Sequence, residues 1–126
     1  TSRLPVVVVL HINHSQEIDP TLAAAIAQLR GHCHSVLNQS VLLRGVNDRV
    51  SALVDLSEAL FRVGVQPYYL NVLDRVAGSA HFAISDAEIA TLYDTLLNTL
   101  PGFLVPKLVR EVPGVGHKIP WSQDAQ

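Results

Sequence analysis

The fold of this chain is decided first by residues 6–14, VVVVLHINH, in which five apolar residues run directly into polar ones. Similar junctions of β-branched or aromatic residues with polar ones return at residues 38–43, NQSVLL, and at residues 67–74, PYYLNVLD. A segment with helical spacing follows each run. Because strands that alternate with helices form a parallel sheet or a β/α barrel, we predict an α/β fold. It should hold about three strand–helix units of a partial parallel β/α barrel, a final strand and a glycine-bearing loop.

Capping and turn residues mark the ends of the predicted elements. Asp19 and Pro20 open a helix that Gly31 ends. Ser85 and Glu88 form a capping box that opens another helix, which reaches about residue 100. We treat residues 1–126 as one domain, with the β/α units and final strand in 1–110 and a loop and tail in 111–126. The remaining predictions are a helix over 49–63, strands over 6–10, 35–43, 66–73 and 103–109, and an irregular loop over 113–120.

Composition narrows the class of protein. A chain of 126 residues with 48% hydrophobic residues can bury the core of one domain. Its formal net charge of -2 argues against partners such as nucleic acid or an anionic membrane, which require a basic surface. The single cysteine, Cys33, cannot form an internal disulfide, which favours a reducing compartment. We therefore expect a cytoplasmic protein that binds a small molecule.

The chain contains two lysines in different settings. Lys107 lies within a strand-like run, whereas Lys118 follows two glycines, Gly114 and Gly116, in a predicted loop. Glycines allow the backbone to approach a flat or phosphorylated ligand closely. A lysine held there can form a Schiff base with a carbonyl compound. The alternative, an exposed lysine in a flexible tail, stays open at this point.

Two carboxylates, Asp74 and Glu111, each follow a predicted strand. In a barrel, that position faces the mouth, where the active site lies. Together they could bind a substrate ammonium group through charge-assisted hydrogen bonds. Equally, each could pair with a nearby arginine such as Arg75 or Arg110.

Six histidines raise the question of a metal site. His11 and His14 lie three residues apart, and His32, Cys33 and His34 are consecutive. Neither spacing matches a zinc motif, which uses cysteine pairs or two histidines on one face of a helix. We therefore predict no metal ligands in this chain, and zinc binding at residues 32–34 is a minor alternative.

Several segments together carry a family resemblance. Residues 38–48, NQSVLLRGVND, resemble the lysine 2,3-aminomutase family of radical S-adenosylmethionine enzymes. The resemblance continues through residues 11–14, HINH, residues 67–70 with Asp74, His81 with Phe82, and the loop into Lys118. Within the family, residues 103–108, FLVPKL, are most similar to the bacterial branch that makes β-lysine for the modification of elongation factor P.

The resemblance implies an isomerase that moves the α-amino group of lysine to the β-carbon. Its cofactors would be pyridoxal phosphate, S-adenosylmethionine and a [4Fe-4S] cluster. Lys118 would form the Schiff base with pyridoxal phosphate, and Asp74 and Glu111 would bind the distal ammonium group of lysine. His11 and Gln39 match family positions that line the S-adenosylmethionine site. Asn13 and His14 would be structural.

The chain also departs from the family pattern. The cluster-binding CxxxCxxC motif requires three cysteines, and Cys33 is the only one here. We therefore expect the chain to be the C-terminal part of the enzyme, inactive by itself. Val115 and His117 interrupt the glycine run, and Glu111 stands where the well-known lysine mutases carry aspartate. The alternative is a non-catalytic α/β module that oligomerises through open sheet edges, and on either interpretation we expect a homo-oligomer.

Overall fold

A single mixed sheet with helices on one side forms the framework of the molecule. The computed structural model describes residues 6–73, 84–110 and 116–122. In this part of the chain the strands are β1 Val7–Leu10, β2 Ser35–Leu42, β3 Gln66–Val72, β4 Lys107–Arg110 and β5 Ile119–Pro120. The helices are α1 Pro20–Arg30, α2 Val50–Arg62 and α3 Asp86–Thr99, with 3-10 turns η1 Ser15–Glu17 and η3 Gly102–Leu104.

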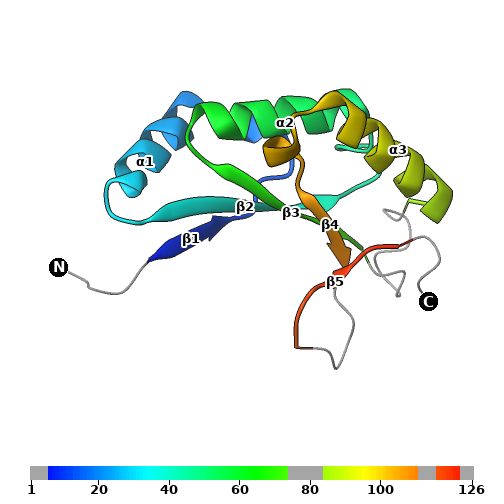
Figure 1. Cartoon of the computed structure of the whole chain (residues 1–126). Helices are drawn as coiled ribbons and strands as arrows, with labels where there is room; N and C mark the ends of the chain where they lie inside the picture. The colour runs from blue at the N-terminus through cyan, green and yellow to red at the C-terminus, as the bar shows by residue number, and fades with distance from the viewer. Residues whose placement is uncertain (1–5, 74–83, 111–115, 123–126) are drawn as a thin grey trace.

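The strands follow one another across the sheet in chain order, β1-β2-β3-β4-β5. The first four are parallel, and β5 runs antiparallel to β4. All three α-helices lie on the same side of this sheet, as Figure 1 shows. The predicted α/β class with a mostly parallel sheet is therefore confirmed. None of the helices in the described ranges has the length and the apolar run that a bilayer span requires.

The core lies between the sheet and the helices. Along β2, burial alternates, so that Val36, Asn38, Ser40 and Leu42 are buried toward the helices. Under α2 and α3 a cluster of leucines and isoleucines fills the space, and a second cluster lies under α1 and α2. The first comprises Leu42, Leu53, Leu70, Ile84, Ile89, Leu96, Leu100, Leu104 and Leu108, and the second Ile12, Ile26, Val36, Leu56, Leu60 and Val65.

The predicted helix starts are confirmed in atomic detail. Asp19 Oδ1 accepts a hydrogen bond of 2.7 Å from Leu22 N, which caps α1. Ser85 Oγ accepts one of 3.2 Å from Glu88 N and caps α3. The Glu88 carboxylate accepts a hydrogen bond from the Ser85 hydroxyl instead of completing the box on the backbone. These caps are local interactions, and local sequence predicts them.

Two predictions near the C-terminal end were wrong. The strand expected over 103–109 begins only at Lys107, because residues 102–104 form a 3-10 turn in which Leu104 N donates to Pro101 O. Part of the segment expected to be an irregular loop forms β5. Trp121 extends this pairing, since its backbone N–H donates to Leu108 O and its side chain packs against the first core cluster. The sequence of residues 119–120 does not predict this strand, because the strand depends on pairing with β4.

Candidate functional site

The sheet face opposite the helices carries polar and aromatic side chains. The side chains form two rows across the strands. In the first row, Gln39 of β2 is the register partner of Tyr69 of β3, which in turn is the register partner of Lys107 of β4. In the second row, two residues further along each strand, Asn71 of β3 lies between Val41 of β2 and Val109 of β4. Along each strand these positions alternate with residues that are buried under the helices, such as Ser40, Leu70 and Leu108, so they face away from the helices.

A β-bulge concentrates tyrosines on this face. Asn38 pairs with Pro67 and the next residue, Gln39, pairs with Tyr69, so Tyr68 is the extra residue of β3. The rings of Tyr68 and Tyr69 lie 4.2 Å apart between centroids, at an angle of 45°. In a regular strand, consecutive side chains point to opposite faces. The bulge instead places two aromatic rings side by side.

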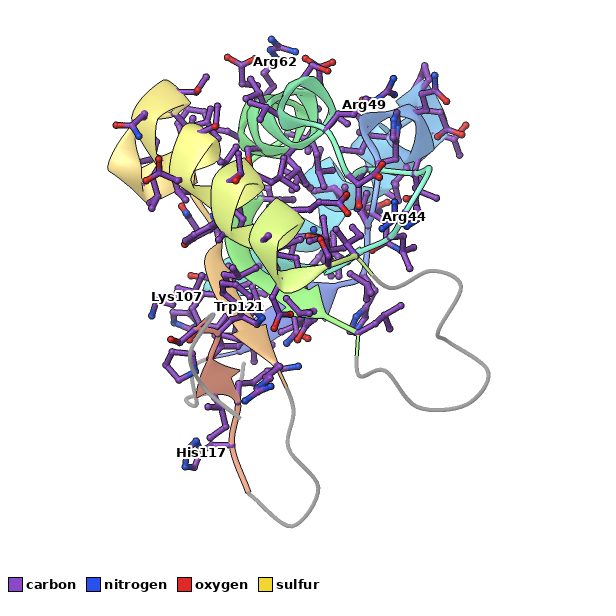
Figure 2. The ribbon with its side chains drawn as sticks, turned by 90° about the vertical axis from the view of Figure 1, so that its right-hand side faces the viewer. Arg44, Arg49, Arg62, Lys107, His117 and Trp121 are labelled. Atoms are coloured by element: carbon purple, nitrogen blue, oxygen red, sulfur yellow. The ribbon has the colours of Figure 1, made fainter. Side chains whose placement is uncertain are left out.

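Lys118 reaches this aromatic pair from the segment before β5. Its Nζ donates a hydrogen bond of 2.6 Å to Asn71 Oδ1 and lies 5.7 Å from the centroid of the Tyr69 ring. Lys107 Nζ lies 5.3 Å from the centroid of the Tyr68 ring. Both distances are within the range of cation–π attraction. Figure 2 shows Lys107 and His117 on the part of the molecule away from Arg49 and Arg62, which lie beside the helices.

The Tyr69 hydroxyl keeps its proton in this setting. A side-chain hydrogen bond with Tyr68 raises the pKa of Tyr69, and burial and the charge of Tyr68 act in the same direction. Tyr69 is therefore a neutral hydrogen-bonding group at neutral pH.

The backbone fixes the place of Lys118. β5 pairs with β4 through Val109 with Pro120 and Arg110 with Ile119, so the residue before Ile119 has a fixed position. An added Cβ at Gly116 would have no heavy atom within 4 Å, which leaves open space beside the segment that carries Lys118. The structure thus joins an anchored lysine with two aromatic rings and an accessible backbone.

The turns after β1 and β2 are held by asparagines. The buried Asn38 bonds Ile12 twice, accepting from its N and donating to its O, both at 2.9 Å. Asn13 Oδ1 accepts from Val41 N at 2.9 Å. His14 Nδ1 accepts from Gln16 N and caps η1. Asn13 and His14 therefore make hydrogen bonds within the fold, next to the exposed His11.

Of the other predicted site residues, the structure describes His11 and Gln39. His11 directly follows β1 and is exposed, and Gln39 is half-buried on the face that carries the tyrosines. Leu10 pairs with Asn38, so His11 and Gln39 are the next positions on neighbouring strands. Asp74 and Glu111 lie outside the described residues, as do His81 and Phe82.

The histidines at 32 and 34 take no part in this site. His34 Nδ1 accepts a hydrogen bond from Val6 N, and His34 N donates to Val6 O, at the opposite end of the strands. A cavity of about 490 Å³ at that end is lined by Cys33, Gln66 and neighbouring residues. Across the described ranges, no group of three or more His, Cys, Asp or Glu side chains is arranged to hold a metal ion.

Sequence reasoning singled out Lys118 but missed its partners. Asn71 directly follows PYYL, yet the sequence pattern assigns neither it nor Tyr69 to the site. The available signal was an asparagine inside a strand, where this residue type is disfavoured. The hydrophobic pattern does not predict the bulge at Tyr68, which places the second aromatic ring on this face.

Comparison with known proteins adds a family to this geometry. No protein-family model matches the chain. It is similar to L-lysine 2,3-aminomutases of Escherichia coli (51% identity, 94% of this chain and 35% of the relative) and Haemophilus influenzae (48%, 97% and 36%). It is also similar to the enzyme of Clostridium subterminale (35%, 92% and 28%). The chain thus spans about a third of the length of the curated relatives it matches.

Proposed function

Since this chain belongs to the lysine 2,3-aminomutase family, we propose that it carries the cofactor lysine and part of the substrate site of an isomerase acting on L-lysine. The reaction is the conversion of L-lysine to β-lysine by 1,2-migration of the amino group. The resemblance of residues 103–108 to one bacterial branch supports elongation factor P as the destination of the product. The observation that carries the proposal is the setting of Lys118.

The surroundings of Lys118 fit an aldehyde-bearing aromatic cofactor. Its ε-nitrogen lies against Asn71 and over the ring of Tyr69, on the face without helices, and space is open at Gly116. Pyridoxal phosphate, when bound, supplies an aldehyde and a conjugated ring through which an amino group can migrate. Lys118 would hold this cofactor through its ε-nitrogen, which is a nucleophile only as the neutral amine.

The remaining assignments are part of the same proposal. His11 and Gln39 line the S-adenosylmethionine site, and Asp74 and Glu111 bind the distal ammonium group of the substrate. The chain does not fit the [4Fe-4S] cluster, because its single cysteine, Cys33, cannot supply three ligands. Ligands for that cluster belong to another part of the full-length protein.

Lys107 provides a matched control for the cofactor assignment. It lies on the same sheet face as Lys118 and also contacts a tyrosine ring, and the chain has no third lysine. The full-length gene product is incubated anaerobically with pyridoxal phosphate, reduced with borohydride and mapped by mass spectrometry. We expect a pyridoxyl adduct on Lys118, its loss in Lys118→Ala, and its retention in Lys107→Ala.

Two outcomes would contradict the proposal. An adduct on Lys107, or none on either lysine, would remove the cofactor role of Lys118 and favour the non-catalytic α/β module. A trapped Lys118 adduct without formation of β-lysine from L-lysine, in a preparation that also contains the cluster and S-adenosylmethionine, would keep the cofactor site but reject the proposed reaction.

A further inference from the structure

The carboxamide of Asn71 has one fixed orientation. Its Nδ2 donates to Ser40 O at 3.1 Å, and its Oδ1 accepts from Lys118 Nζ at 2.6 Å. An amide nitrogen only donates and an amide oxygen accepts, so these two partners allow one of the two flip states. The side chain thus connects the backbone of β2 to a lysine 47 residues further along the chain.

The position of Asn71 does not favour asparagine for reasons of folding. It is the penultimate residue of β3, between Leu70 and Val72. Its register partners on the neighbouring strands are Val41 and Val109. β-branched residues suit such a position, and asparagine is among the residues that strands disfavour. Where one residue has a low strand propensity and the rest of the strand has a high one, that residue usually has a functional role.

Asn71 restrains a side chain that otherwise has many conformations. Lysine has a flexible four-carbon side chain, and holding it in one conformation costs up to about 2 kcal/mol of rotamer entropy. The backbone of Lys118 is fixed by the pairing of β5 with β4, and its nitrogen by Asn71 Oδ1 and the ring of Tyr69. Asn71 thereby engages one N–H of the nitrogen.

We propose that Asn71 is a positioning residue for Lys118, whose Oδ1 holds the ε-amine at the point where it meets an aldehyde-bearing cofactor. This inference rests on the proposed function, since it assigns to Asn71 a role in the attachment of pyridoxal phosphate. Holding a nucleophile in the reactive geometry raises the rate of bond formation. Attachment of the cofactor should therefore depend on Asn71 even when no substrate is present.

Two substitutions of nearly equal size test the role. In the full-length gene product, attachment of pyridoxal phosphate is followed by absorbance and by borohydride trapping on Lys118, across pH, without substrate or S-adenosylmethionine. Asn71→Leu removes the acceptor, so we expect attachment to slow roughly tenfold and the midpoint of its pH profile to fall. Asn71→Asp keeps an acceptor and adds a negative charge, which favours the ammonium form and should raise the midpoint by about 1 pH unit.

Opposite shifts separate positioning from general loosening of the structure. A structural defect would move both variants in the same direction. The ionisable groups around Lys118 among the described residues are Tyr68 and Tyr69 on β3, Lys107 and Arg110 on β4, and His117 beside it. All of them are the same in every variant. Asn98→Leu on α3, where the amide bonds only the preceding turn in the described contacts, serves as the control and should match the wild type.

The outcomes distinguish this inference from the proposed function. If the wild type forms no adduct on Lys118, the cofactor assignment fails and the role of Asn71 fails with it. If the wild type forms the adduct and both Asn71 variants keep its rate and midpoint, the positioning role is overturned and the cofactor assignment stands. Should Asn71→Leu not fold, Asn71→Asp decides alone, and an unchanged midpoint in that variant overturns the inference.

Discussion

Three asparagines hold segments of this chain together through hydrogen bonds that no hydrophobic pattern reveals. Asn38 bonds the turn after β1, and the fully buried Asn47 accepts from Leu43 N while donating to Asn13 O and Val41 O. Asn71 bonds β2 and Lys118. From sequence, Lys118 could be singled out by its glycines and the family resemblance. Its contact with Asn71 could not, because it depends on which strands become neighbours.

Gly64 offers a prediction at this scale. Its φ is +83°, and a Cβ built on it would clash with the guanidinium group of Arg30. The end of an arginine side chain can move, so the strained backbone should dominate the cost. We expect Gly64→Ala to lower the free energy of unfolding of the purified protein by about 1 kcal/mol or more.

A second substitution checks the reason for that cost. Gly102→Ala, where the added Cβ meets nothing within 4 Å, should change stability by less than about 0.5 kcal/mol. Combining Gly64→Ala with Arg30→Ala should not restore stability. Full rescue in a denaturant titration would show that the clash with Arg30, and not the backbone conformation, causes the loss.

At the scale of elements, the helices and the first three strands follow from local sequence, whereas β4 and β5 do not. Caps such as Asp19 and Ser85 act within one turn, so they can be recognised in isolation. β5 pairs with the edge of β4, and Trp121, which follows β5, packs against the first core cluster. Those partners are distant in sequence, and two residues are too few to show alternation.

Tyr93 connects two elements and gives a prediction with a pH dependence. Its hydroxyl donates to Pro106 O at 2.8 Å, which ties α3 to the segment before β4. Burial raises the pKa of Tyr93, partly offset by a backbone hydrogen bond with Leu108. Because the folded state holds this proton more tightly, the stabilisation is complete below the unfolded pKa of about 10 and declines as pH rises through the higher folded value.

The corresponding variant is Tyr93→Phe. We expect it to lower the free energy of unfolding by about 1 kcal/mol at neutral pH, with a difference from the wild type that narrows at alkaline pH. Thr95→Val, which removes an exposed hydroxyl bonded within the same helix, is the control and should have little effect. A difference for Tyr93→Phe that grows above pH 10 would contradict the assigned proton.

At the scale of the whole molecule, the sheet leaves much of its surface without cover from the described residues. The helices all lie on one face, and Val7 and Val9 of β1 are 51% and 38% exposed. The chain also spans only about a third of its relatives. Exposed apolar strand edges recruit further strands unless they are covered or charged. The barrel and the oligomeric state that the sequence predicts remain predictions.

We expect the 126-residue chain, purified by itself, to self-associate through β1. Light scattering after size exclusion should give a mass above that of one chain. Substituting both Val7 and Val9 with lysine should return it to the monomer mass, because charged side chains block pairing at an edge. Leu97→Lys on α3, a site 51% exposed and remote from the strands in the fold, should leave association unchanged. A monomeric unsubstituted chain would contradict this expectation.

The bulge at Tyr68 has a consequence for how this sequence can change. With Tyr68 omitted, Pro67 would still face the helices, Tyr69 the opposite side and Leu70 the helices, as in an unbroken strand. Tyr68 therefore adds nothing to the packing of the core. The residues before and after it still alternate between the two faces of the sheet as they would without it. A single inserted codon is enough to add a second aromatic ring beside the first. The ring beside Tyr69 can therefore be gained or lost on the face opposite the helices without any change in the packing of the core.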